Sequence, residues 1–64
     1  MKARTVDIAL TLTDREAWVY AQFLKRVTFS DYRQRAINED ETYTMIDAGE
    51  RLRDALRKAG YAPR

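Results

Sequence analysis

Residues 5–13, Thr-Val-Asp-Ile-Ala-Leu-Thr-Leu-Thr, alternate apolar and polar side chains. This period of two residues is typical of a half-buried β-strand. A strand needs a neighbour to pair its backbone N–H and C=O groups, and no second stretch of the sequence shows the same pattern. The sequence therefore predicts a strand that pairs with its own copy in a homodimer. The side chains expected on the buried face of that dimer strand are Val6, Ile8, Leu10 and Leu12.

The chain has 64 residues and contains no cysteine and no histidine. We expect one small domain over residues 1–64, near the lower size limit for folding without disulfides or a metal. The usual zinc ligands and the commonest catalytic bases and thiols are missing. This composition predicts a protein that is not an enzyme and has no cofactor and no metal site.

The charge and hydropathy of the chain limit its partners only loosely. Twelve basic against ten acidic residues give a net charge of +2, with both signs interspersed. Such a balance is typical of a solvated helical surface and neither requires nor excludes nucleic acid. No stretch resembles a signal peptide or approaches the ~20 apolar residues of a membrane span. We therefore expect a cytoplasmic protein without a membrane partner.

Helix signals follow the predicted strand. Thr13 and Glu16 have the spacing of a capping box in front of a helix expected over residues 14–27. Ser30 is a plausible N-cap for a short helix over 31–37, although the pattern leaves open whether that segment is a separate helix. The predicted fold class is α+β and mostly helical: one N-terminal β-strand followed by two or three α-helices, β-α-(α)-α.

The last helix is expected over residues 40–59. Gly60 suits the left-handed position after its end, and Tyr61 can fold back onto the last turn. Gly49 lies on the apolar face of this helix, where glycine costs about 1 kcal/mol relative to alanine. Its presence there indicates the close approach of another part of the molecule. Two favourable i,i+4 ion pairs are expected on the outer face, Asp47–Arg51 and Asp54–Lys58.

The first helix carries the best candidate for a protein interface. A large aromatic residue and an outward valine stand beside polar and basic side chains, as in interface anchors with a charged rim. The simpler interpretation is that the tryptophan covers a small core and the valine is a single exposed residue. The candidate interface residues are Trp18, Val19, Gln22 and Arg26.

A second candidate surface is basic. Lysine and arginine at the end of the first helix and along the next segment could contact phosphates, although cations at a helix C-terminus are also favoured by the helix dipole alone. The residues concerned are Lys25, Arg26, Arg33 and Arg35.

Residues 4–36 resemble the ribbon-helix-helix DNA-binding proteins in element order. The resemblance implies a dimer whose outward strand residues enter the major groove, here Asp7, Ala9 and Thr11. It also implies a phosphate at the start of the second helix, near Ser30 and Asp31. A carboxylate at position 7 and an alanine at position 9 depart from the basic or amide side chains usual in that family.

A second resemblance covers most of the chain. The stretches at residues 10–14, 21–27, 29–33 and 59–64 are similar to a family of short uncharacterised proteins encoded by proteobacterial phages and prophages. This resemblance implies an accessory protein that acts on a host or defence protein, and it assigns no functional residues. The leading hypothesis is thus a small dimeric binding protein with a protein partner. The alternatives are a ribbon-helix-helix-like DNA-binding regulator and a structural role in a phage assembly.

Overall fold

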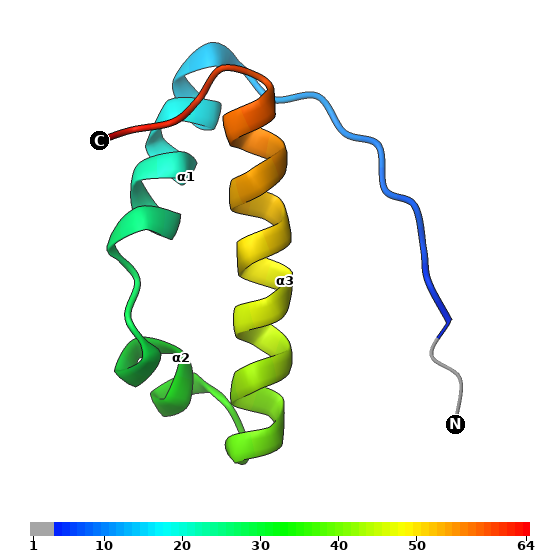
Figure 1. Cartoon of the computed structure of the whole chain (residues 1–64), viewed down its shortest axis with the longest axis vertical. Helices are drawn as coiled ribbons and strands as arrows, with labels where there is room; N and C mark the ends of the chain where they lie inside the picture. Colours follow the sequence, from blue (N-terminus) through cyan, green and yellow to red (C-terminus); the bar gives the residue numbers. More distant parts are fainter. Residues whose placement is uncertain (1–3) are drawn as a thin grey trace.

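The computed structural model describes residues 4–64, which contain three helices joined by short turns. Helix α1 spans Asp14–Arg26, α2 spans Phe29–Arg35 and α3 spans Glu39–Lys58. The long helix α3 is the spine of the molecule. Both α1 and α2 pack on it, one after the other along its length, and α1 runs antiparallel to it (Figure 1).

The predicted β-strand is wrong, because residues 4–64 contain no strand and no sheet. Residues 4–13 form an extended segment, here called the arm, which stands apart from the helices (Figure 1). The backbone of residues 4–12 makes no hydrogen bond to another described residue. Alternation of apolar side chains correctly indicated an extended conformation, but a strand also requires a ladder partner. The fold class is therefore all-helical with an extended arm, and not α+β.

Helix α1 begins where the sequence predicts. The Thr13 Oγ1 accepts a hydrogen bond from the Glu16 N–H at 3.0 Å, and the Glu16 carboxylate accepts one from the Thr13 N–H at 2.8 Å. This capping box satisfies backbone donors that the first helical turn would otherwise leave unpaired. The helix ends at Arg26, one residue before the expected end.

Helix α2 is a separate helix, but it begins earlier than predicted. Thr28, not Ser30, is its N-cap, and the helix ends at Arg35. The reason is a second capping box, in which the Asp31 carboxylate accepts from the Thr28 N–H at 2.9 Å and Thr28 Oγ1 accepts from the Asp31 N–H at 3.3 Å. Two reciprocal bonds outcompete the single bond that a serine cap would provide.

The end of α3 is as expected. Gly60 has a φ of 102°, and the Tyr61 N–H donates to the Leu56 carbonyl at 2.9 Å while the Gly60 N–H donates to the Arg57 carbonyl at 3.0 Å. These two bonds form a Schellman motif, which ends the helix and turns the chain back. The Tyr61 ring then meets Trp18 edge-on, with ring centroids 5.2 Å apart. The C-terminal segment thus closes over the start of α1 (Figure 1).

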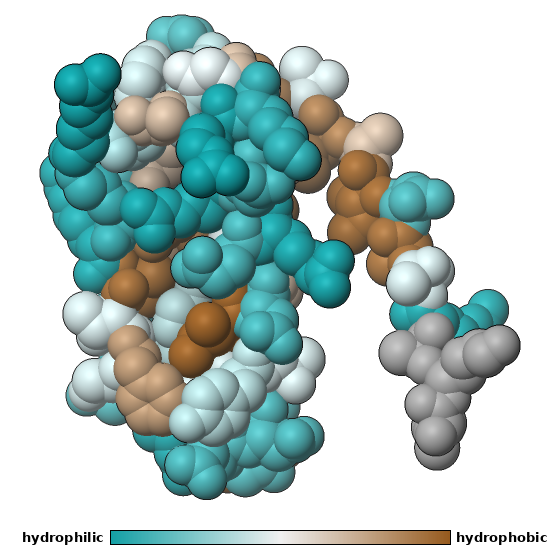
Figure 2. All heavy atoms as spheres, viewed as in Figure 1, coloured by the Kyte–Doolittle hydropathy of each residue, from teal (hydrophilic) through white to brown (hydrophobic). Residues whose placement is uncertain are grey.

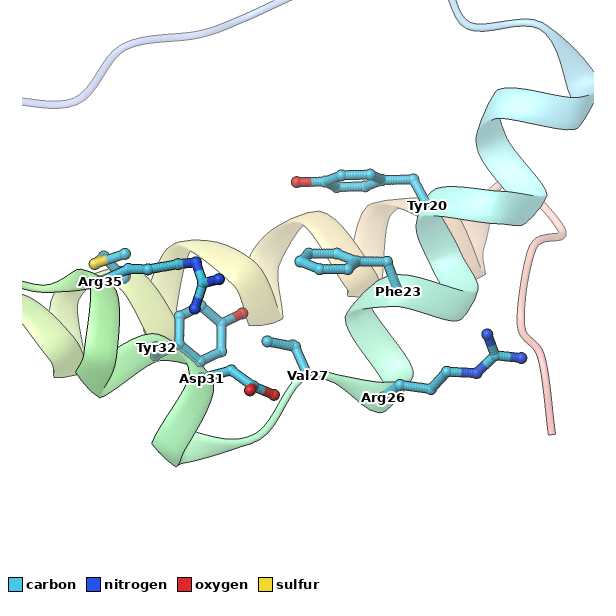
Figure 3. A pocket seen from close by; sticks show the side chains of 8 residues that line it. Tyr20, Phe23, Arg26, Val27, Asp31, Tyr32 and Arg35 are labelled. Carbon is cyan, nitrogen blue, oxygen red and sulfur yellow. The ribbon is translucent and has the colours of Figure 1, made fainter.

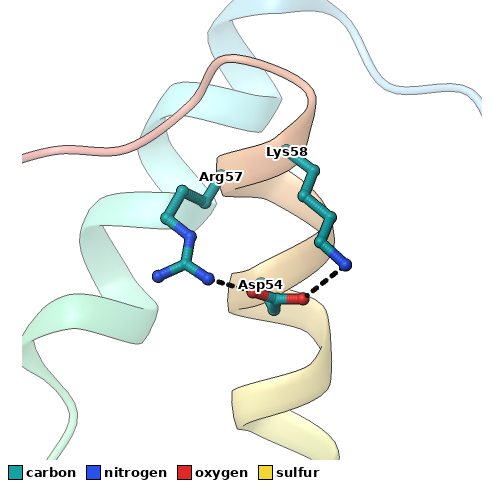
Figure 4. A network of polar contacts seen from close by, with 3 residues as sticks. All are labelled: Asp54, Arg57 and Lys58. Carbon is teal, nitrogen blue, oxygen red and sulfur yellow. Dashed lines mark hydrogen bonds and ion pairs between the residues drawn. The ribbon is translucent and has the colours of Figure 1, made fainter.

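One of the two predicted ion pairs on α3 forms. Asp54 accepts from Lys58 at 3.1 Å and also pairs with Arg57, so that two cations of the last turn share one carboxylate (Figure 4). The Lys58 ammonium is the main reason that the pKa of Asp54 lies below its ordinary value. The Asp47–Arg51 pair does not occur among the ion pairs of residues 4–64.

The buried core is small. Ala17, Ala21 and Leu24 of α1 are the buried apolar side chains, and Thr42 and Gly49 are buried on α3. Thr42 is fully enclosed, and its hydroxyl donates to the Asn38 carbonyl at 2.9 Å. None of the helices in residues 4–64 has the length and apolar character needed to cross a bilayer. A core of this size leaves most of the larger apolar side chains at the surface.

Candidate functional site

An apolar groove follows the junction of α1 and α3 and comprises two neighbouring hollows. Tyr20 borders both of them. The upper hollow, near the C-terminal end of α3, encloses about 1040 Å³. Its walls come from α1, from α3 and from the arm, and they include Val19, Leu52, Ala55, Ile8 and Leu10.

The arm forms the outer wall of the upper hollow and remains strongly exposed. Its apolar side chains are exposed by 77% at Val6, 76% at Ile8 and 63% at Leu10. Figure 2 shows these hydrophobic side chains standing apart from the helical body. Of the dimer-strand residues of the sequence prediction, Val6, Ile8 and Leu10 are thus largely exposed in the single chain, whereas Leu12, next to the helices, is 41% exposed.

The lower hollow lies between α1 and α2 and encloses about 500 Å³. Tyr20 and Phe23 project into it from α1, with ring centroids 5.4 Å apart, and Tyr32 and Arg35 project from α2 (Figure 3). Burial is the main cause of the raised pKa of Tyr32. This hollow therefore combines aromatic walls with a cationic edge.

Asp31 also borders the lower hollow, but its charge is already engaged. Its pKa is lowered mainly by the hydrogen bond from the Thr28 backbone N–H, and further by the Thr28 hydroxyl. The carboxylate is therefore ionised at neutral pH and occupies the N-terminus of α2. An incoming anion would meet a negative charge there.

The structure places the four predicted interface residues on the outer side of α1. Trp18 is 40% exposed because Tyr61 covers one edge of its ring, and Val19 is 54% exposed. Gln22 is half-buried and Arg26 is exposed. The Arg26 guanidinium points away from the aromatic side chains of the lower hollow (Figure 3). Trp18 thus packs against Tyr61 on one side and keeps an exposed face.

The predicted basic cluster lies at two helix ends. Lys25 and Arg26 belong to the last turn of α1, and Arg33 and Arg35 to the last turn of α2. The Arg33 guanidinium donates to the Ala36 carbonyl at 3.4 Å, just past the end of its helix. These are positions where the helix dipole favours cations, so the cluster needs no ligand to account for it.

Sequence reasoning missed the aromatic groove wall. Tyr20 and Phe23 were not among the candidate interface residues of the first helix, yet they are 45% and 50% exposed. The signal that could have found them is the stripe of Ala17, Ala21 and Leu24, which is narrow and composed mainly of small side chains. A contact made by alanines allows two helices to approach closely. The larger side chains on either side of that contact then stay outside it.

The chemistry available at the groove is that of a binding surface. Aromatic and aliphatic walls with a few charged side chains at the edge are suited to apolar side chains of a polypeptide. Within residues 4–64, acidic side chains do not gather into a group of three that could hold a metal ion.

Comparison with known families assigns the chain to one of them. The model of a family of unknown function, DUF7706, matches residues 1–64. The chain belongs to the DUF7706 family. No curated protein and no solved structure gives a significant match to this DUF7706 member. The family match covers the whole domain and comes with no assigned activity. The surface described above is therefore the basis for a functional proposal.

Proposed function

We propose that this DUF7706 protein is a non-catalytic binding protein that acts by contact with another protein. The observation that carries the proposal is the exposure of α1. Four large apolar side chains of this 13-residue helix are 40–54% exposed, namely Trp18, Val19, Tyr20 and Phe23. Apolar exposure of this extent on one short helix of a small domain is characteristic of interaction surfaces.

The outer side of α1 is the proposed contact surface. It presents Trp18 and Val19 with Gln22 and Arg26 beside them, a mixture of aromatic, aliphatic and arginine side chains that is enriched at interface hot spots. The exposed guanidinium of Arg26 favours a partner that offers acidic side chains around an apolar centre. The partner is thus expected to be a protein surface, not a small molecule.

The setting of the proposed function comes from the resemblance to short phage and prophage proteins. It favours a cytoplasmic accessory protein, with a host defence or regulatory protein as its target. An inhibitor in that setting needs only a binding surface, which agrees with the absence of cysteine and histidine from the chain.

DNA binding of the ribbon-helix-helix type is the less favoured alternative. That mode relies on a paired strand in the major groove, and residues 4–64 contain no strand. Its phosphate site would coincide with the Asp31 carboxylate at the start of α2. The basic side chains of the two helix ends nevertheless provide a concrete test.

The proposal is tested by capture with matched variants. Immobilised wild-type protein, Trp18→Ala and Arg26→Glu are exposed to a bacterial lysate, with Arg51→Glu as a charge-matched control on the opposite side of α3. We expect a protein that is retained by the wild type and by Arg51→Glu and lost from the other two. Circular dichroism checks that Trp18→Ala stays folded, since Trp18 also packs on Tyr61.

A second measurement separates protein binding from DNA binding. Fluorescence anisotropy with duplex DNA at low and high salt would show an affinity that falls steeply with salt if phosphates were contacted. Salt-dependent binding that is lost in Arg33→Glu and Arg35→Glu would favour the DNA-binding alternative. Equal capture of every lysate protein by all variants would contradict the proposed surface.

A further inference from the structure

We propose that the arm of one copy docks in the upper hollow of the groove of a second copy, and that the contact is reciprocal. The dimer is then held by two identical contacts, each between an arm and a groove. This inference does not depend on the proposed function: the hollow and the Trp18 surface share Val19, but the residues that test the docking, Leu10 and Leu52, belong only to the arm and the hollow.

The arm has an apolar surface in need of a partner. Val6, Ile8 and Leu10 are 63–77% exposed and share one side of the extended segment. Burying such side chains is favourable by about 1.5–3 kcal/mol each, and the single chain does not achieve it. The backbone of residues 4–12 is likewise free to make new hydrogen bonds.

The upper hollow matches the arm in chemistry and in length. Leu52 of α3 is 46% exposed there, with Ala55 and Ala59 along the same side of the helix. The α3 side of the hollow runs over residues 52–59, about 12 Å at 1.5 Å per helical residue. An extended segment covers that length in about four residues, so the apolar stretch at residues 6–10 can lie along it.

The chain's own arm is held away from this space. The capping box fixes the backbone where the arm joins α1, with Thr13 bonded in both directions to Glu16. From that point the arm forms the outer wall of the hollow, so the space lies between the arm and the helices. A second copy's arm can enter there without any change in the cap.

The exposed area agrees with a missing partner. The chain exposes 5856 Å², whereas a folded monomer of this mass exposes about 4,200 Å². The excess is roughly 1,600 Å² per chain, about twice the roughly 800 Å² that a standard interface buries on each partner, so the surface left open is large enough for such an interface. The net charge of +2 per chain offers little repulsion between copies. Reciprocal contacts of this kind close into a two-fold dimer.

Sedimentation equilibrium of the full chain tests the dimer directly. We expect a mass of twice the 7.5 kDa of one chain. Leu10→Asp in the arm and Leu52→Asp in the groove should each weaken dimerisation by roughly 100-fold, because each places a charge in an apolar contact. The matched controls are Thr11→Asp on the other side of the arm and Arg51→Glu on the other side of α3, and both should remain dimeric.

Mixing the two defective variants identifies the receptor of the arm. Leu10→Asp keeps an intact groove, and Leu52→Asp keeps an intact arm. The mixture should form a heterodimer through one arm-to-groove contact, at concentrations where neither variant associates alone. Circular dichroism confirms that both variants keep their helices.

Three outcomes would overturn the inference. A wild-type chain that stays at 7.5 kDa would mean that the arm has no partner copy. Dimerisation that Leu52→Asp leaves unchanged would show that the arm binds somewhere other than the groove. Equal loss in Thr11→Asp and Leu10→Asp would show that the contact does not depend on the apolar side of the arm. None of these results bears on capture of a partner by the Trp18 surface.

Discussion

The contact of α2 with α3 and the contact of α1 with α3, here called the α2 seam and the α1 seam, are built differently. Where α2 covers α3, the Tyr32 side chain lies directly over Gly49, and Thr42 is fully enclosed. Where α1 covers α3, the contact is a narrow row of small residues, and Leu52 beside it stays 46% exposed. The apolar face of a helix is thus buried only over the width that the neighbouring helix covers. The wider part of the α1 seam remains available to another molecule.

The largest expected effect concerns the narrow α1 seam. Leu24 is the only large side chain in its buried row, at 5% exposure. Leu24→Ala removes most of the buried apolar volume and should lower the free energy of unfolding by about 2–5 kcal/mol, a large share of the stability of so small a domain. Urea denaturation followed by circular dichroism measures this loss.

Leu52→Ala is the matched substitution on the exposed side of the same seam. Because Leu52 is half-exposed, its loss should lower the stability of the isolated chain by less than about 1 kcal/mol. Comparable losses at the two positions would mean that Leu52 belongs to the core and that the groove is already filled.

The α2 seam is tested by adding a methyl group at position 49, beneath the Tyr32 ring. A Cβ atom at this position would lie 2.2 Å from the Tyr32 hydroxyl oxygen and 3.3 Å from the ring carbon that bears it. Gly49→Ala should therefore destabilise the protein by about 1–3 kcal/mol through overpacking, despite the better helix propensity of alanine. Thermal unfolding of the single variant gives the size of this effect.

A double-mutant cycle assigns that effect to Tyr32. In Tyr32→Phe the closest atom is gone, so Gly49→Ala should cost less or become stabilising by up to about 1 kcal/mol. Additivity between the two substitutions would show that the hydroxyl is not what excludes a side chain at position 49.

The start of α1 and the end of α3 could be predicted well from the sequence. Which segments pack against the apolar faces of these helices could not. Caps are local, so that Thr13 with Glu16 and Gly60 with Tyr61 could be recognised from spacing alone. Gly49 was correctly predicted to permit close packing, but its partner Tyr32 depends on how α2 folds back. The strand prediction failed because pairing depends on a second segment, which alternation within residues 5–13 cannot supply.

The candidate site shows the same contrast between features that are local in the sequence and features that depend on helix packing. Val19 was predicted to point outward and is 54% exposed, and Trp18, for which a surface role and a core role were both open, is 40% exposed. The groove wall formed by Tyr20 and Phe23 was missed, because the pattern of apolar residues in α1 does not show how much of its apolar face α3 covers. Which residues flank a seam depends on the distance between two helices, and no local pattern in either helix determines that distance.

The start of α2 offers a smaller, pH-dependent effect. The pKa of Asp31 is lowered in the folded protein by the Thr28 N–H and hydroxyl, so the folded state favours the ionised carboxylate. Its contribution is complete above the ordinary pKa of 3.8 and is lost as the pH falls through the lower folded value. Unfolding measured from pH 7 to pH 3 should therefore show a loss of stability at the acid end.

Two variants separate the contribution of the Thr28 hydroxyl from that of the Asp31 carboxylate. Thr28→Ala should lower stability by about 1 kcal/mol at neutral pH, because it removes the hydroxyl that accepts from the Asp31 N–H. Asp31→Asn should remove part of the loss at low pH. An unchanged acid profile in Asp31→Asn would assign the loss to other carboxylates, such as Asp54.

The smallest expected effect lies where the C-terminal segment meets the start of α1. The Tyr61 hydroxyl donates to an Asp14 carboxylate oxygen at 2.7 Å, and this bond is the main cause of the raised pKa of Tyr61. Tyr61→Phe removes the bond but keeps the ring against Trp18, so the melting temperature should fall slightly. The wild type should approach the variant as the pH rises above 10 and through the raised pKa of the folded protein, because the bond requires the protonated hydroxyl, whose contribution is lost as the phenol ionises. Tyr61→Ala also removes the ring and should expose Trp18 further, which tryptophan fluorescence detects as a red shift. A red shift of equal size in Tyr61→Phe would mean that the hydrogen bond, and not the ring contact, holds the C-terminal segment over α1.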